Sequence, residues 1–311
     1  MKSNVTFRSA GLMLAGHLYT PDDGVTGPRA TVVVGHPGSG VKEQAAGLYA
    51  QRLSRAGFVA LAFDAAHQGE SEGEPRDLED PAQRVEDFRA AVSFLSNRPE
   101  VDPGRIGLLG ICASGGYVVS AAATDPRVRS VATVSAVDMG RQFGKGADGT
   151  QDPAVVRGML DAAAAARTAE AGGEGVGAFP IFPATEEEAR AGGRHLFEGW
   201  EYYRTDRAQH PRSATSLTWN SVDRLVSFDA FRFIGLIAPR PLLMIAGREA
   251  VTSWMTEEAI ESARQPKESH WIEGASHVDL YDKDEYVSPA LVKLTDFFRA
   301  GLGDRTRSAA A

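Results

Sequence analysis

The stretch Arg105–Tyr117, RIGLLGICASGGY, decides the fold. Its short apolar run, Ile106–Leu109, predicts a strand, which enters a tight turn of small residues with Cys112 at the tip. The Ala- and Val-rich run from Gly115 to Ala123 then predicts a helix. A strand, a sharp turn and a helix, with a nucleophilic side chain on the turn, are typical of a nucleophile elbow, G-x-Nu-x-G.

The small positions of this motif are Gly110 and Ser114, two residues before and two after Cys112. Serine stands where glycine is usual, which is a departure from the pattern. A second register would make Ser114 the nucleophile, between Cys112 and Gly116, but it would put that side chain inside the helix and away from the tip of the turn. We therefore favour Cys112, and the simplest alternative is a buried cysteine with no chemical role.

The composition indicates a globular chain whose partner is a small molecule. The 311 residues are 43% hydrophobic, and 33 Lys and Arg against 41 Asp and Glu give a net charge of −8. This charge disfavours nucleic acid and an anionic membrane as partners. A single cysteine excludes an intramolecular disulfide and a cysteine-cluster metal site. The N-terminus has no apolar signal segment and no run is long enough to cross a bilayer, so we expect a cytoplasmic protein.

Apolar strands alternate with helices along most of the chain. A continuous β-branched run predicts a strand buried on both faces at residues 30–34, and further strands are predicted at residues 58–63, 106–109, 128–134, 241–246 and 268–272. Asp80 and Pro81 open one of the intervening helices, as a capping residue followed by proline in the first turn. This alternation predicts an α/β fold, with a mostly parallel central sheet flanked by helices.

The pattern breaks between two of these strands. Residues 138–222 carry helical segments but no strand signal, which predicts a helical cap inserted into a core formed by residues 1–137 and 223–311. Aromatic side chains in and beside this insertion either line a substrate pocket or form a small core of the cap. Our candidates for substrate binding are Trp200, Tyr203 and Trp254.

Three chemically active residues follow predicted strands in a specific order. A nucleophile on an elbow, an acid after a later strand and a histidine after the last strand is the order of triad members in α/β hydrolases, and Cys112, Glu249 and His277 satisfy it. The acid is the least certain member. The alternatives are Asp138, at the end of the strand after the elbow, and Asp279 and Asp282 in the loop of the histidine.

The expected chemistry is acyl transfer through a thiolate. The N-terminus of the elbow helix and a nearby imidazole should lower the pKa of Cys112, and His277 should accept its proton while Glu249 orients the imidazole. The loop His36–Gly40, HPGSG, follows a strand in the place where α/β hydrolases supply one backbone N–H of an oxyanion hole. We expect the backbone N–H groups of Gly38 and Ala113 to form that hole.

Several segments together resemble a known family. They are the run from His36 to Lys42, FDAAHQGESEG, Pro75-Arg76, GICASGGY, APRPLLMIAGREA and GASHVDLYD. They are similar to a family of bacterial and fungal α/β hydrolases that is related to dienelactone hydrolases and includes polyketide-transferase-like members. The resemblance covers nearly the whole core but not the cap. It implies an α/β-hydrolase fold, a triad carried onto Cys112, His277 and Glu249, and no metal or organic cofactor.

Three functions are compatible with these observations. The first is cleavage of an ester, lactone or thioester through an acyl-cysteine intermediate, and the second is an acyl transferase or cyclase of secondary metabolism on the same triad. The third is a lyase or a non-catalytic binding protein on this fold, because fold does not fix function. The expected partner is a small acyl compound, free or carrier-bound, without nucleic acid or membrane. The sequence leaves the oligomeric state open, and a dimer is compatible with it.

Overall fold

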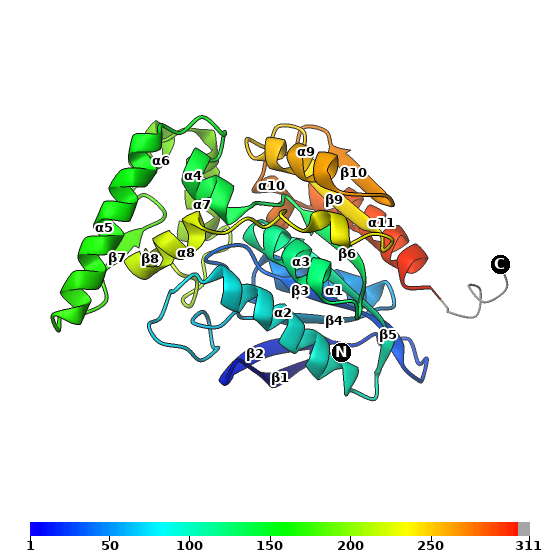
Figure 1. Cartoon of the computed structure of the whole chain (residues 1–311). Coiled ribbons are helices and arrows are strands. Elements are labelled where there is room, and N and C mark those ends of the chain that lie inside the picture. Colours follow the sequence, from blue (N-terminus) through cyan, green and yellow to red (C-terminus); the bar gives the residue numbers. More distant parts are fainter. Residues whose placement is uncertain (304–311) are drawn as a thin grey trace.

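The computed structural model describes residues 1–303 and is built on one eight-stranded sheet (Figure 1). The strand order is β1-β2-β4-β3-β5-β6-β9-β10. The bounds are β1 Lys2–Ser9, β2 Leu12–Tyr19, β3 Arg29–Gly35, β4 Val59–Phe63, β5 Val101–Ile111, β6 Val128–Val134, β9 Leu242–Gly247 and β10 Lys267–Ile272. The pairs β1/β2 and β2/β4 are antiparallel and all the others are parallel, which confirms the predicted mostly parallel sheet.

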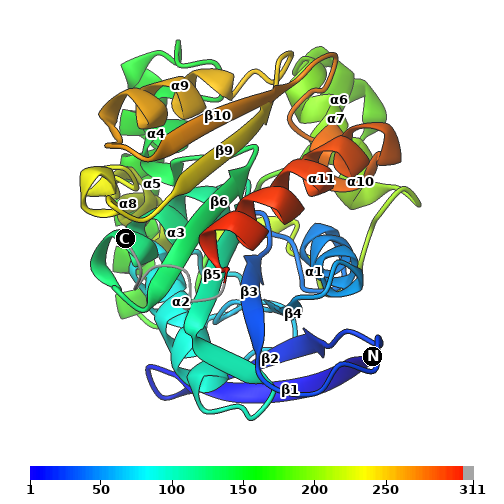
Figure 2. The same ribbon diagram turned by 90° about the vertical axis from the view of Figure 1, so that its right-hand side faces the viewer.

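Helices cover both faces of this sheet (Figure 2). Helices α1 (Ala45–Arg55) and α11 (Asp284–Gly301) pack on one face, and α2 (Pro81–Ser96), α3 (Ala113–Thr124) and α9 (Ser253–Ser262) pack on the other. Each face therefore has its own apolar cluster, and the central strands are buried on both sides. This double burial explains why these strands are continuous apolar runs in the sequence.

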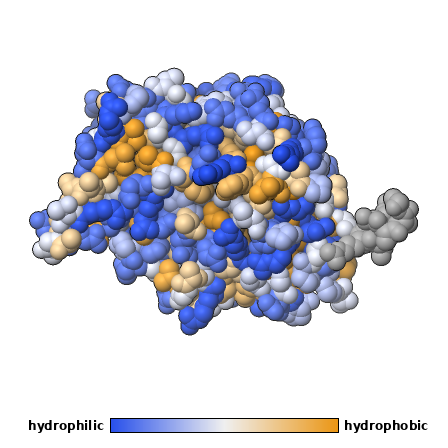
Figure 3. Space-filling model, in the orientation of Figure 1, coloured by the Kyte–Doolittle hydropathy of each residue, from blue (hydrophilic) through white to orange (hydrophobic). Residues whose placement is uncertain are grey.

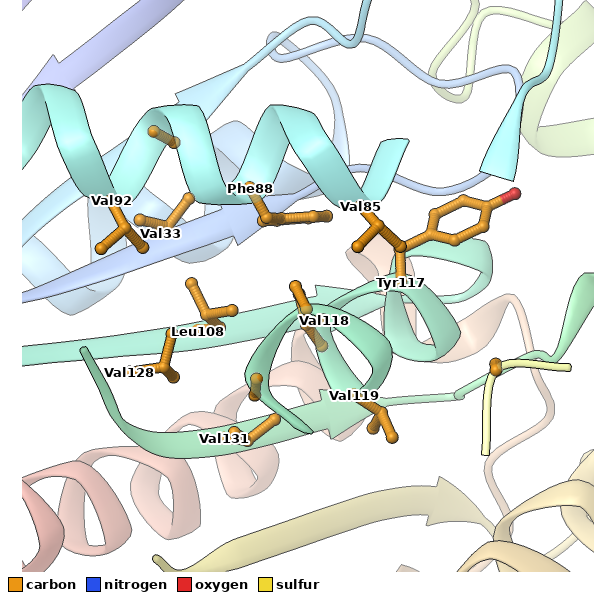
Figure 4. Packing of buried hydrophobic residues seen from close by; sticks show 14 of the residues in the cluster. Val33, Val85, Phe88, Val92, Leu108, Tyr117, Val118, Val119, Val128 and Val131 are labelled. Atoms are coloured by element: carbon orange, nitrogen blue, oxygen red, sulfur yellow. The ribbon is translucent and has the colours of Figure 1, made fainter. Parts of the chain in front are cut away.

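The packing of α2 and α3 fixes where the elbow lies (Figure 4). Val33 of β3 and Leu108 of β5 pack in the same buried cluster as Phe88 of α2 and Val118 of α3. Asp80 caps α2 as predicted, because its carboxylate accepts hydrogen bonds from the backbone N–H groups of the first turn. With both helices anchored in this way, the turn between β5 and α3 is held at the carboxyl edge of the sheet.

The insertion lies between β6 and β9 and gathers at one side of the sheet, at the left of Figure 1. Its elements are α4 (Met139–Lys145), α5 (Pro153–Ala171), β7 (Ala178–Pro180), α6 (Glu186–Ala191), α7 (Arg194–Arg204), β8 (Ser216–Thr218), η1 (Trp219–Ser221) and α8 (Val222–Val226). The sequence did not predict the two-stranded sheet β7-β8, since each strand has only three residues. Residues 138–222 remain our proposed bounds of the cap.

The outer surface is mostly hydrophilic on the face in Figure 3, with apolar residues gathered in small areas, one of them over the inserted helices. Among residues 1–303, no helix is both long enough and apolar enough to span a membrane.

Candidate active site

Cys112 is held in a strained backbone conformation at the tip of the elbow. It is the residue before α3, and its φ of 54° and ψ of −121° lie in a region that non-glycine residues rarely adopt. Such a residue costs about 1–3 kcal/mol and persists only where its surroundings fix it. A Cβ atom on Gly110 would lie 2.1 Å from the carbonyl oxygen of Ser114, so the turn requires glycine there. The strand–turn–helix geometry predicted for residues 105–117 is thus present.

Ser114, the departure from the elbow pattern, is part of a buried polar network. Its hydroxyl donates a hydrogen bond of 2.6 Å to the carbonyl oxygen of His36 and accepts one of 3.1 Å from Arg84. The space for its side chain comes from Gly35, where a Cβ atom would lie 2.6 Å from the Ser114 hydroxyl oxygen. Ser114 is 1% exposed and lies within α3, so this geometry favours Cys112 as the nucleophile.

Three polar groups lie close to the thiol of Cys112. They are the hydroxyl of Tyr281 and the backbone N–H groups of Ala113 and Gly38. Burial raises the pKa of the Cys112 thiol, although these three groups oppose the rise. The expected lowering of this pKa is therefore not found, because removal from water outweighs the hydrogen bonds and the helix terminus.

His277 lies in the loop after β10 and is buried. Its Nε2 is 2.9 Å from the hydroxyl oxygen of Tyr281, and its Nδ1 is 2.6 Å from Oγ1 of Thr252. The ring of His195 stands perpendicular to it, with 5.1 Å between the ring centroids. Burial and the neighbouring His195 hold the pKa of His277 well below its usual value, so the resting imidazole is neutral. The site at rest thus contains a neutral thiol and a neutral imidazole.

The predicted triad acid, Glu249, is not bonded to His277. Its carboxylate forms a 2.7 Å ion pair with Arg194 of α7, and both side chains are about half exposed. The backbone N–H of Glu249 donates to the carbonyl oxygen of Ala275, and the side chain is turned outward toward the inserted helix. The partner of Nδ1 is Thr252 instead, three residues further along the same loop.

The alternative acids are also engaged elsewhere. Asp138 is fully buried and caps α4, where it also pairs with Arg141. Asp279 accepts a hydrogen bond from the backbone N–H of Ser276 and pairs with Lys283. Asp282 pairs with Arg207. In the described part of the chain, none of these carboxylates has a hydrogen bond to His277.

The two predicted oxyanion donors, Gly38 and Ala113, lie together at the sulfur of Cys112. The loop that carries Gly38 is held from the insertion, because the hydroxyl of Tyr203 donates to the Gly38 carbonyl oxygen at 3.2 Å and the hydroxyl of Ser213 donates to that of Ser39 at 2.7 Å. These hydrogen bonds hold the Gly38 loop beside the turn that carries Cys112.

A buried ion pair between Arg84 and Glu79 lies next to the elbow. Arg84 of α2 bonds to the ring Nε2 and the carbonyl oxygen of His36 at 3.1 Å each, and it lies 3.5 Å from the carboxylate of Glu79. The hydroxyl of Tyr117 donates to Glu79 at 2.7 Å. Burial and the Arg84 charge hold the pKa of His36 well below its usual value, which keeps this imidazole neutral. No sequence pattern predicts this network beyond the helix that carries Arg84.

A cavity of about 250 Å³ opens over Cys112 and His277, beneath the insertion. Its apolar lining comes mainly from the insertion and includes Met139, Phe143, Ile181, Phe182, Leu196 and Leu217. Gln142 and His195 also line this cavity, and Oε1 of Gln142 and Nδ1 of His195 are buried without a hydrogen-bond partner. The cavity is therefore an apolar space with two free polar groups in its wall.

Of the three aromatic residues predicted to bind substrate, only Tyr203 lines this cavity. Trp254 instead donates from Nε1 to the carbonyl oxygen of Ala147 at 2.8 Å and packs against Gly149. Trp200 stacks on Phe197 within α7. Composition alone could not separate these cases, because the direction of each ring depends on the packing of the inserted helices.

Residues 1–303 contain no group of three or more His, Cys, Asp and Glu side chains that could hold a metal ion.

Tyr281 and Thr252 are the two site residues that the sequence analysis missed. Tyr281 lies in the predicted histidine loop, GASHVDLYD, and Thr252 follows the predicted acid by three residues. The sequence analysis therefore covered both segments but assigned no role to either residue.

Comparisons with known proteins agree with this architecture. Residues 32–290 match the model of the "Alpha/beta hydrolase family". The chain is 37% identical to protein YcjY of Escherichia coli (strain K12) over 307 residues, which cover 97% of this chain and all of that protein. It is 30% identical to thiohydrolase apmlB of Arthrinium phaeospermum, with 99% of both chains covered. It is 25% identical to acyltransferase drtE of Aspergillus calidoustus, with 92% of this chain and 91% of that protein covered.

Two solved structures have the same overall fold as this chain. The crystal structure of protein PA2218 from Pseudomonas aeruginosa has a TM-score of 0.90 and 35% identity, and the match covers 97% of this chain and 94% of that chain. The structure of DcsB in complex with its substrate analogue has a TM-score of 0.85 at 21% identity, and the match covers 98% of this chain and all of that one.

Proposed function

Because the chain belongs to the alpha/beta hydrolase family, we propose that it cleaves an activated ester, lactone or thioester through an acyl-cysteine intermediate on Cys112. One observation carries this proposal: the Cys112 sulfur has two backbone N–H donors and the Tyr281 hydroxyl around it, at the floor of an apolar cavity. Backbone donors beside a nucleophile stabilise the oxyanion of a tetrahedral intermediate, which is the central need of acyl transfer.

The reaction begins with the neutral thiol. As the sulfur attacks the acyl carbon, the thiol proton passes to His277 and the carbonyl oxygen gains negative charge, which the N–H groups of Gly38 and Ala113 receive. One such donor contributes about 3–4 kcal/mol in enzymes where it has been removed. The imidazolium then protonates the leaving group, and a water molecule activated by His277 releases the acid from Cys112.

The leaving group decides which acyl compounds react. A tetrahedral intermediate on cysteine can expel the thiolate again unless the other leaving group is at least as good, so thioesters and activated esters suit this site and simple amides do not. The raised pKa of Cys112 relaxes this preference in part, because a more basic thiolate is a poorer leaving group in the reverse step.

The cavity indicates the size and polarity of the acyl group. Its volume of about 250 Å³ is just below the range of roughly 300–1,000 Å³ that is typical of small-molecule sites. The apolar lining suits a short or medium acyl chain. The free amide oxygen of Gln142 and the free Nδ1 of His195 suit a hydroxyl or carbonyl group on that chain, since an unpaired buried polar atom is unfavourable.

The test of this function is turnover and acyl-enzyme formation with aryl esters and acyl thioesters of increasing chain length. We expect intact-protein mass spectrometry to detect an acyl adduct on wild-type protein and none on Cys112→Ala, with loss of turnover in the variant. Ser114→Ala is the comparison for the second register of the elbow. Full turnover by Cys112→Ala would refute an acyl-cysteine mechanism and leave a lyase or a binding protein on this fold.

A second candidate function is acyl transfer to an alcohol or amine. The apolar cavity beneath the insertion favours it, because exclusion of water lets another acceptor compete for the acyl-enzyme. The similarity to proteins named acyltransferase drtE and polyketide transferase claH also supports it. Adding alcohols and amines to the preformed acyl-enzyme measures the partition, and exclusive formation of the free acid would argue for hydrolysis alone.

A further inference from the structure

Tyr281 lies between the proposed nucleophile and the proposed base. It belongs to the short helix α10 (Asp279–Asp282), four residues after His277, and it is 2% exposed. Its hydroxyl is 2.9 Å from Nε2 of His277 and lies close enough to the Cys112 thiol to lower the pKa of that thiol. Cys112, His277 and Tyr281 line the same cavity, so this hydroxyl is placed to connect the thiol and the imidazole.

The position of this hydroxyl is fixed by its neighbours. The ring of Tyr202 packs edge-on against that of Tyr281, with 5.1 Å between their centroids. The hydroxyl of Tyr49 donates to the carbonyl oxygen of Leu280 at 2.8 Å, which anchors the backbone next to Tyr281. A side chain held in this way cannot rotate freely, and its hydroxyl stays close to both groups.

The hydrogen bonds around His277 define a direction for proton movement. In the tautomer that a relay requires, Nδ1–H donates to Oγ1 of Thr252 and the lone pair on Nε2 accepts the O–H of Tyr281. The Tyr281 hydroxyl also lies beside the Cys112 thiol, and with its own proton directed at Nε2 its oxygen is the acceptor available to the S–H. The chain S–H, O–H, Nε2 is therefore continuous from the thiol to the base.

We propose that Tyr281 relays the proton from Cys112 to His277 during acyl-enzyme formation. The S–H bond breaks as the proton moves to the Tyr281 oxygen, and the Tyr281 O–H bond breaks as its own proton moves to Nε2. The products are a thiolate, a neutral tyrosine and an imidazolium, and no proton is gained or lost. This inference rests on the proposed function and deepens it, since it assigns a further catalytic residue to the same site.

Tyr281, Cys112 and His277 are all neutral at rest, which agrees with a relay that operates only while the sulfur attacks the substrate. Burial raises the pKa of the Tyr281 hydroxyl well above its usual value, so a tyrosinate does not accumulate. Burial also opposes a thiolate on Cys112 and an imidazolium on His277 before substrate arrives. After transfer, the Tyr281 O–H donates to the thiolate and Nε2–H donates to the Tyr281 oxygen, so both new charges have a hydrogen-bonding partner.

The test compares Tyr281→Phe with Tyr202→Phe and Cys112→Ala. Tyr202 is a matched control, because it is an adjacent buried tyrosine whose hydroxyl accepts from the backbone N–H of Ala45 and does not contact Cys112 or His277. We expect Tyr281→Phe to lower the single-turnover acylation rate by about 100-fold, the lower end of general acid–base effects. We expect Tyr202→Phe to stay within about twofold of wild type, since its hydroxyl has a structural hydrogen bond only.

Two further measurements separate a relay from a structural role. Alkylation of Cys112 by iodoacetamide should shift to higher pH in Tyr281→Phe, because the hydroxyl lowers the pKa of the thiol. In wild type, the acylation rate in mixtures of H₂O and D₂O should depend quadratically on the deuterium fraction, as expected for two moving protons; this needs no variant and holds even if Tyr281→Phe fails to fold.

The outcomes distinguish the relay from the function on which it rests. If Cys112→Ala is inactive while Tyr281→Phe acylates at the wild-type rate with an unchanged alkylation profile, the relay is wrong and the acyl-cysteine mechanism stands. A linear dependence on the deuterium fraction would likewise overturn the relay. If Cys112→Ala retains full turnover, the proposed function itself fails.

Discussion

Oγ1 of Thr252 lies 2.6 Å from Nδ1 of His277, on the side of the imidazole where a catalytic carboxylate orients the ring in Ser–His–Asp triads. Thr252 is 2% exposed, and no charged group replaces it at this nitrogen among residues 1–303. A neutral hydroxyl fixes the direction of the ring but gives an imidazolium less stabilisation than a carboxylate would. The site therefore holds the base in place without raising its affinity for a proton, which agrees with the lowered pKa of His277.

Replacing Thr252 with valine should impair catalysis more than folding. The change keeps the shape of the side chain but removes the acceptor of Nδ1–H, whose hydrogen bond strengthens when the imidazole becomes charged. A hydrogen bond to a charged group contributes about 1.5–3 kcal/mol, so we expect kcat/KM to fall by about 10- to 100-fold. Steady-state kinetics on an acyl thioester measures this.

The control is Thr256→Val in helix α9. Thr256 is buried and its hydroxyl has no hydrogen-bond partner, so the same chemical change there should leave kcat/KM unaltered and keep or raise the melting temperature. Equal kinetic losses in both variants would mean that Thr252 acts through packing and not through His277.

Glu249→Gln should leave catalysis nearly unchanged. Glu249 pairs with Arg194 at the surface, where an ion pair contributes about 0–1 kcal/mol. We expect kcat/KM within about twofold of wild type, because the carboxylate does not contact His277. A loss of 100-fold or more, measured on the same thioester, would instead give Glu249 the role of triad acid that the sequence order predicted.

The fold could be predicted from the sequence wherever it depends on a local hydrophobic pattern. The candidate site could be predicted only in part. Runs such as residues 128–134 are apolar because both faces of the strand are buried, so their position and type follow from the sequence. The order of Cys112 and His277 along the chain can also be predicted, since Cys112 directly follows the buried strand β5 and His277 lies in the loop after the last strand, β10. What the sequence could not supply is the direction of a side chain within a loop.

Glu249 and Thr252 illustrate this limit. Both lie in the loop after β9, and the choice between them as partner of His277 depends on the turn geometry and on Arg194, which belongs to an inserted helix more than 50 positions away in the sequence. The serine at position 114 of the elbow illustrates the same limit. Gly35 leaves space for its side chain and Arg84 donates a hydrogen bond to its hydroxyl, but these residues belong to another strand and another helix, and no sequence spacing connects them with Ser114.

Ser114→Gly restores the usual elbow pattern but should destabilise this protein. Glycine would remove the hydroxyl that bonds to His36 and Arg84 and leave the buried Arg84 with one acceptor fewer, at a cost of about 1–3 kcal/mol. The control is Ser120→Gly in the same helix, whose cost should be near the intrinsic helix penalty of about 0.5 kcal/mol. Urea unfolding of both variants measures the difference, and equal stabilities would show that the Ser114 network contributes nothing.

The pH dependence of Cys112 alkylation tests the neutral resting state. Burial raises the pKa of the thiol and lowers that of His277, so deprotonation of the thiol requires a pH above that of an ordinary cysteine, and no ion pair forms at lower pH. We therefore expect the iodoacetamide rate to rise steadily above pH 8, toward a plateau beyond the usual thiol pKa of about 8.5. At pH 7 the reaction should be slower than with free cysteine. A fast plateau between pH 5 and 8, as a preformed thiolate–imidazolium pair produces, would contradict this and would mean that the proton moves before substrate binds.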